Sequence, residues 1–140
     1  MCRHALNRFS CSPEAARTGR RFVAQVLEEW GVGPGDPAAA SLDDLILLSS
    51  ELLTNAVKAC SGDIVVEITA HRDSIELAVE DDSPLAAVLR RPDESGGRGL
   101  HIVEALATRW GQQPASTGHK RVWCQMAVPV GSIIGEGCRL

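Results

Sequence analysis

The stretch LSSELLTNAVKAC, residues 48–60, lays a polar stripe along an otherwise apolar helix. Glu51, Asn55 and Lys58 stand at i, i+4 and i+7, which groups them within an arc of roughly 60° at 3.6 residues per turn. An acid, a carboxamide and an amine at the edge of a core are costly to bury unless they meet a ligand, an ion or one another. The alternative is an ordinary solvated helix face with weak surface pairs.

Outward from this helix, apolar spacing and turn residues predict the other elements. Residues 12–30 and 99–107 have helical spacing, and Ser12-Pro13-Glu14 is expected to cap and open the first of these helices. Residues 64–70 and 74–79 alternate and predict an antiparallel hairpin. A helix is also expected at 42–60, with strands at 6–9, 109–112 and 120–130. This order predicts a two-layer α/β sandwich whose mixed, mostly antiparallel sheet carries its helices on one face.

Length and charge limit the classes of protein to consider. A chain of 140 residues predicts a single domain, with an ordered core at about 12–130 and a frayed tail at 131–140. The net charge of −4 disfavours direct binding to nucleic acid or to anionic lipid. No stretch approaches the roughly 18 consecutive apolar residues of a membrane span.

The five cysteines are odd in number and contain no CxxC pair, so we expect no closed disulfide framework. Reduced thiols fit this pattern best, and reduced thiols favour a cytoplasmic protein.

Two further segments could carry chemistry. Asp81-Asp82-Ser83-Pro84 ends an apolar strand, where a carboxylate can accept a hydrogen bond from an exocyclic amine such as that of adenine. Gly96-Gly97-Arg98-Gly99-Leu100 precedes a helix and would let an anion approach the backbone at the helix N-terminus. Taken singly, residues 81–84 are equally compatible with an ordinary acidic turn, and the glycine pattern of residues 96–100 is weak evidence for a site. The spacing of a Walker A loop is absent.

In this order the segments resemble the GHKL ATPase superfamily over about residues 12–130. Residues 51–56 resemble its N box, residues 81–84 its first glycine box and residues 96–100 its second. Within the superfamily, the chain is most similar to the compact anti-sigma-factor serine kinases of actinomycetes. The segment Lys120-x-Val122-Trp123 also resembles the last strand of these kinases.

The resemblance implies a Bergerat-type ATP-binding fold with ATP and Mg²⁺ as cofactors. It assigns Asn55 as a Mg²⁺ ligand, Glu51 as the general base and Asp81 as the acceptor of the adenine amine. Residues 85–95 would form the ATP lid. The remaining residues of the implied nucleotide site are Lys58, Ser83, Gly97, Arg98, Gly99, Leu100 and Lys120.

The resemblance further implies a protein serine kinase that acts on an anti-anti-sigma-type partner and can sequester a sigma factor, with homodimer formation left open. The alternative is a regulator that docks on a partner without catalysis. Three departures from the family pattern keep this alternative open: Ala59 lies where a His is frequent, Ser83-Pro84 replaces glycine, and Arg121 replaces a common Thr. A histidine-kinase catalytic fragment is disfavoured, because no dimerising phospho-acceptor helix pair is expected.

Overall fold

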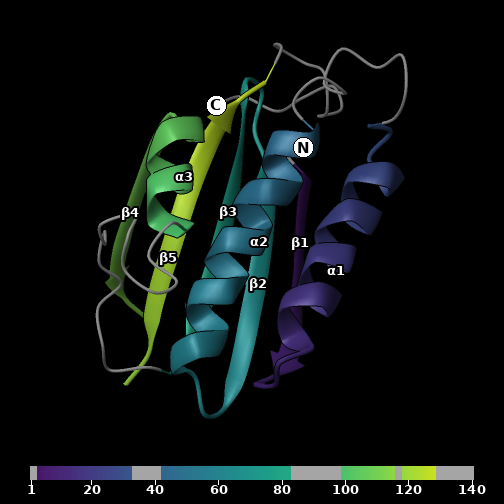
Figure 1. Cartoon of the computed structure of the whole chain (residues 1–140). Helices are drawn as coiled ribbons and strands as arrows, with labels where there is room; N and C mark the ends of the chain where they lie inside the picture. Colours follow the sequence, from purple (N-terminus) through teal and green to yellow (C-terminus); the bar gives the residue numbers. More distant parts are fainter. Residues whose placement is uncertain (1–2, 33–41, 83–98, 116–117, 129–140) are drawn as a thin grey trace.

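A computed structural model describes residues 3–32, 42–82, 99–115 and 118–128 of the chain (Figure 1). The elements in chain order are β1 (Arg3–Ser10), α1 (Ala15–Glu29), α2 (Leu42–Ala59), β2 (Asp63–Ala70), β3 (Ser74–Asp81), α3 (Gly99–Leu106), β4 (Arg109–Pro114) and β5 (Lys120–Ala127). The predicted lid at 85–95 and tail at 131–140 lie outside the described residues. No helix within the described ranges is long and apolar enough to cross a membrane.

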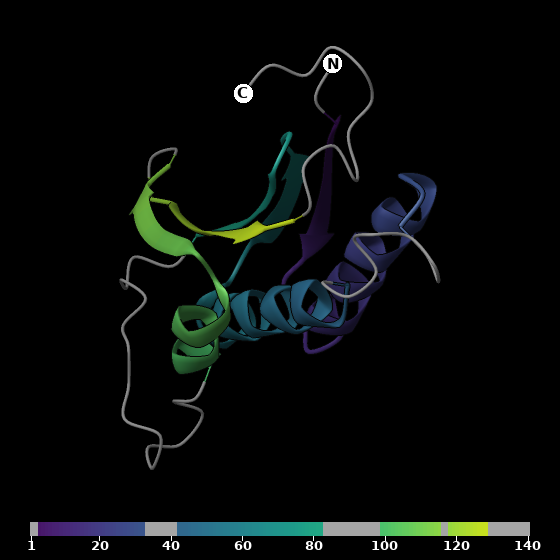
Figure 2. The ribbon, with the colours of Figure 1, turned by 90° about the horizontal axis from the view of Figure 1, so that it is seen from above.

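The five strands form one sheet in the order β1-β2-β3-β5-β4, and all four of its pairings are antiparallel. The three helices lie together on one face of this sheet, with α2 between α1 and α3 (Figures 1 and 2). The predicted two-layer α/β sandwich is therefore confirmed. In the described residues the sheet is antiparallel throughout rather than mixed.

The core lies between the sheet and the helices because alternate strand residues point toward α1 and α2. On β2 the buried residues are Ile64, Val66, Ile68 and Ala70, while the residues between them are half-buried. This period of two is the reason that the hairpin of β2 and β3 could be predicted from sequence.

Helices α1 and α2 approach each other closely at Gly19. A Cβ atom at this position would lie 2.8 Å from both Cδ atoms of Leu53, which is fully buried on α2. The small residue on α1 thus makes room for a large apolar side chain on its neighbour.

The predicted start of α1 is wrong. The helix begins at Ala15 with Glu14 as its N-cap, and no side chain provides a capping hydrogen bond. The carbonyl of Ser12 instead accepts the N–H of Ala15 at 3.1 Å, in a turn that precedes the helix.

The expectation of reduced thiols is also wrong for one pair of cysteines. Cys11, in the bend between β1 and α1, forms a disulfide with Cys60, which directly follows α2. Their Cα atoms are 6.0 Å apart, although 49 positions separate them in the sequence. An odd number of cysteines does not exclude a single disulfide, and this one joins the bend before α1 to the end of α2. Cys124 is free and buried.

Candidate functional site

The polar stripe expected on the central helix lies on α2, at the border between buried and exposed surface. Glu51 and Asn55 are half-buried and Lys58 is exposed. The neighbouring residues Leu52 and Ala56 are buried. The stripe therefore starts at the edge of the core and runs out to solvent.

Asn55 has an unusual environment for a carboxamide on such a helix. Its Nδ2 atom is buried and has no hydrogen-bond partner among the described residues. An unsatisfied buried amide nitrogen costs free energy unless a ligand or water completes it. Among the three residues of the stripe, Asn55 is thus the one with a buried polar atom that a ligand could satisfy.

Asp81 is the last residue of β3, and its side chain points to the helix-covered face with Ile75, Leu77 and Val79. It is only 1% exposed, which is rare for a carboxylate. Its Oδ2 atom lies 3.8 Å from the Nζ atom of Lys120, the first residue of β5. The two residues face each other in the β3–β5 register, and the ammonium group compensates part of the cost of burying the carboxylate.

The next residue, Asp82, has a different role that the sequence analysis missed. Its carboxylate accepts hydrogen bonds from the Ser61 N–H at 2.9 Å, the Ser61 hydroxyl at 2.9 Å and the Gly62 N–H at 2.7 Å. The backbone N–H of Ser61 is the main reason that the pKa of Asp82 lies below its ordinary value. Asp82 therefore fixes the turn between α2 and β2 against the end of β3.

Of the predicted glycine segment, the structure describes only its end. Gly99 and Leu100 form the first two residues of α3. Ser83, Gly97 and Arg98 lie outside the described residues, so their assignment to a nucleotide site stays a prediction. The structure brings Asp81 and Lys120 together and places Glu51, Asn55 and Lys58 on α2, which packs against β3.

Comparison with known proteins identifies the family. The model of the histidine kinase-like ATPase domain matches residues 9–124. The chain belongs to this family. No curated protein gives a significant match. The match extends from β1 to β5, so it includes α2, the end of β3 and Lys120. Membership supports the GHKL superfamily and implies that the domain binds ATP.

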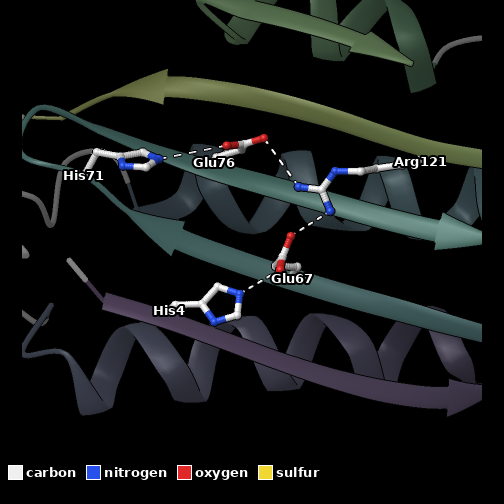
Figure 3. Close-up of polar contacts among 5 residues, drawn as sticks. All are labelled: His4, Glu67, His71, Glu76 and Arg121. Atoms are coloured by element: carbon white, nitrogen blue, oxygen red, sulfur yellow. Dashed lines mark hydrogen bonds and ion pairs between the residues drawn. The ribbon is translucent and has the colours of Figure 1, made fainter. Parts of the chain in front are cut away.

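A second polar cluster lies on the sheet face turned away from the helices (Figure 3). Arg121 contacts Glu67 at 2.6 Å and Glu76 at 3.5 Å. His4 contacts Glu67 at 2.7 Å, and His71 lies 3.9 Å from Glu76. Partial burial raises the pKa of Glu67, but the contacts of its carboxylate with His4 and Arg121 outweigh burial and lower that pKa overall.

This cluster explains one departure from the family pattern. Arg121 replaces a common Thr, but neighbouring strand residues point to opposite faces, so its side chain lies across the sheet from Lys120. The Arg121 side chain consequently does not occupy the Asp81–Lys120 end of the helix-covered face.

Within the described ranges, no three or more His, Cys, Asp or Glu side chains come together in a group that could hold a metal ion.

Proposed function

We propose that this ATPase-family domain binds Mg-ATP and phosphorylates a serine of an anti-anti-sigma-type protein, and that it also binds a sigma factor. The observation that carries the proposal is the buried Asp81–Lys120 pair at the end of β3, in a family that implies ATP binding. Such a regulator acts in the cytoplasm and on proteins, which agrees with a net charge of −4 that disfavours nucleic acid.

The Asp81 carboxylate would select the base. An ionised carboxylate only accepts hydrogen bonds, and that of Asp81 is paired with the ammonium of Lys120 at 3.8 Å. The exocyclic amine of adenine can donate to it, whereas guanine presents a carbonyl oxygen at the same ring position. Two opposed acceptors in a buried site leave both unsatisfied, which costs binding free energy. We therefore expect ATP to bind more tightly than GTP.

Asn55 fits the role of a Mg²⁺ ligand. Its amide has a buried atom without a described partner, and a half-turn of the amide exchanges its nitrogen and oxygen. Mg²⁺ commonly takes one or two protein oxygens and fills its other positions with water and phosphate oxygens. A single carboxamide therefore suffices, and the lack of a larger ligand cluster in the described residues is no obstacle. When bound, Mg²⁺ would neutralise charge on the phosphates.

Glu51 would act as the general base. It precedes Asn55 by one helical turn on α2, so the two side chains lie on the same helix face. Its carboxylate would accept the proton of the serine hydroxyl while the hydroxyl oxygen bonds to the γ-phosphorus of ATP. The bond from that phosphorus to the oxygen of ADP breaks in the same reaction.

Calorimetric titration tests the nucleotide site. The protein is titrated with ATP and with GTP, each with and without Mg²⁺, and the series is repeated on Asp81→Asn and on the exposed control Asp63→Asn. We expect saturable binding of ATP over GTP that Mg²⁺ strengthens, that Asp81→Asn abolishes and that Asp63→Asn retains. No binding at millimolar nucleotide would contradict the proposal.

The alternative function is a regulator that docks on its partner without phosphotransfer. It is favoured by Ala59, which lies where the family often has a His, at the end of α2. This alternative predicts that Glu51→Ala leaves the binding of the partner protein and its regulation unchanged. A kinase predicts that the same change retains partner binding but abolishes phosphorylation of the partner.

A further inference from the structure

The disulfide between Cys11 and Cys60 lies beside the turn that Asp82 holds. Both cysteines are half-buried, so small reagents can reach them. We propose that Cys11 and Cys60 form a reversible redox site, at which low-molecular-weight thiols and disulfides open and close the cross-link and so change the nucleotide-binding end of β3. The effect on nucleotide rests on the proposed function, whereas the redox site itself does not.

A short chain of contacts connects this disulfide to Asp81. The N–H of Cys11 donates to the carbonyl of Gly62 at 2.9 Å, so both the cross-link and a backbone hydrogen bond hold the turn after α2. On its other side, Ser61 and Gly62 donate hydrogen bonds to the carboxylate of Asp82. Asp82 directly follows Asp81 in the chain. The turn is thus fixed between the disulfide and the end of β3.

The backbone of Gly62 lies directly against the carboxylate of Asp82. A Cβ atom at Gly62 would lie 2.8 Å from Oδ2 of Asp82, closer than non-bonded atoms normally approach. A shift of the turn must therefore move the Asp82 carboxylate or break its hydrogen bonds. Opening the disulfide releases Cys60 from Cys11 and permits such a shift.

The chemistry is thiol–disulfide exchange. One thiolate of a dithiol reductant attacks one sulfur of the Cys11–Cys60 bond, which releases the other cysteine as a thiolate and leaves a mixed disulfide. The second thiolate of the reductant then attacks the reductant's own sulfur in this mixed disulfide and releases the first cysteine. Two electrons pass to the protein, each cysteine sulfur gains a proton, and the reductant becomes a cyclic disulfide. A low-molecular-weight disulfide reverses the reaction. In a cytoplasm, where the thiol pool keeps most cysteines reduced, a pair of this kind is transient and reports the redox state.

The free cysteine in the core does not compete in this exchange. Cys124 is 1% exposed, and burial raises the pKa of its thiol to about 12. The thiolate that exchange requires is therefore scarce at neutral pH. Among the described cysteines, the reactive site is the Cys11–Cys60 pair.

The first experiment does not depend on nucleotide. The full chain is prepared with dithiothreitol or with its oxidised form, the Cys11–Cys60 link is verified by peptide mass spectrometry, and amide hydrogen exchange is measured. We expect reduction to accelerate exchange of the Ser61 and Gly62 amides at least about tenfold and to leave the Leu77 amide in β3 unchanged. A Cys11–Cys60 link that does not open in dithiothreitol and re-form with its oxidised form would overturn the redox site. Equal exchange at Ser61 and Gly62 in the two states would overturn the coupling of the disulfide to the turn.

Matched variants assign the response to this pair. Cys11→Ser/Cys60→Ser should exchange fast at the turn under both conditions, whereas Cys2→Ser/Cys138→Ser should respond to reduction like the natural chain. A response lost in the second variant would overturn the assignment. If the first variant does not fold, reduction of the natural chain gives the same comparison.

The second experiment measures the effect on nucleotide. Calorimetry should show ATP binding weakened about fivefold or more by reduction, the lower range of measured coupling between sites. Equal ATP affinity in both states would overturn control of the site by the cysteines. Absence of ATP binding in both states would instead overturn the proposed function. Mass spectrometry and amide exchange would still decide whether the redox site exists and whether it acts on the turn.

Discussion

Asp81 and Lys120 face each other across β3 and β5, and their carboxylate and ammonium groups lie 3.8 Å apart on the helix-covered face of the sheet. A charged pair in this position is unusual, because the other β3 residues on the same face, Ile75, Leu77 and Val79, are apolar and buried. Its burial makes the pair sensitive to the loss of either partner, since the remaining charge keeps its desolvation cost but loses the attraction of the other charge.

Lys120→Met should therefore lower the free energy of unfolding by about 3 kcal/mol, measured by urea denaturation. The matched control is Arg121→Met at the next position of β5, whose ion pairs with Glu67 and Glu76 are partly exposed. The control should cost about 1 kcal/mol or less, because solvent screens its pairs. Equal losses in the two variants would contradict a special role for the Asp81–Lys120 pair.

Glu51→Gln should separate catalysis from binding. The amide cannot take a proton from the attacking hydroxyl. We therefore expect transfer of the γ-phosphoryl group of ATP to water, and the ADP release that accompanies it, to slow about 100-fold or more, with ATP affinity nearly unchanged. The control Glu104→Gln, on the exposed side of α3, should change neither quantity. ADP release is measured with a coupled assay, and undiminished release by Glu51→Gln would exclude this residue as the base.

The sequence predicted the elements of the fold better than their ends. The hairpin of β2 and β3 could be identified because one strand face is buried and its residues alternate. β1 is longer than predicted, since pairing with β2 rather than apolar alternation holds the whole stretch Arg3–Ser10 in the sheet. The start of α1 was wrong because Cys11, just before it, is held by Gly62 and Cys60, and these tertiary contacts outweigh the local signal of Ser12 and Pro13.

The candidate site could be predicted only in part. Spacing on one helix placed Glu51, Asn55 and Lys58 on one face, because helical geometry is local. The contact of Asp81 with Lys120 depends on the register of two strands that are distant in sequence, which no local pattern encodes. The disulfide was missed for the same reason, since spacing along the chain does not give the distance between two cysteines in space.

The close approach of α1 and α2 predicts a size limit at Gly19. Gly19→Val should lower the free energy of unfolding by about 1–3 kcal/mol, because the new side chain would overlap the buried Leu53. Valine has a higher helix propensity than glycine, so this loss would come from the overlap alone. Ala24→Val, at an exposed position of the same helix, introduces the same side chain without overlap and should cost only a few tenths of a kcal/mol, because valine has a lower helix propensity than alanine. Similar unfolding midpoints for the two variants would show that the helices have room at Gly19.

The hydrogen bonds to Asp82 predict a loss of stability in acid. The N–H of Ser61 contributes most to the lowered pKa of this carboxyl, whose ordinary value is 3.8, and the Ser61 hydroxyl and the Gly62 N–H add to it. Because the pKa is lower in the folded state, the stabilisation is complete above the ordinary value and disappears as the pH falls through the folded-state pKa. Asp82→Asn should therefore be less stable than the natural protein at about pH 6, and the difference should shrink at about pH 3 and below. Urea denaturation at both pH values measures this difference in the free energy of unfolding.

Ser61→Ala should show a smaller version of the same effect, because the backbone donors remain. A stability difference for Asp82→Asn that does not change with pH would show that the ionised carboxylate does not hold the turn after α2.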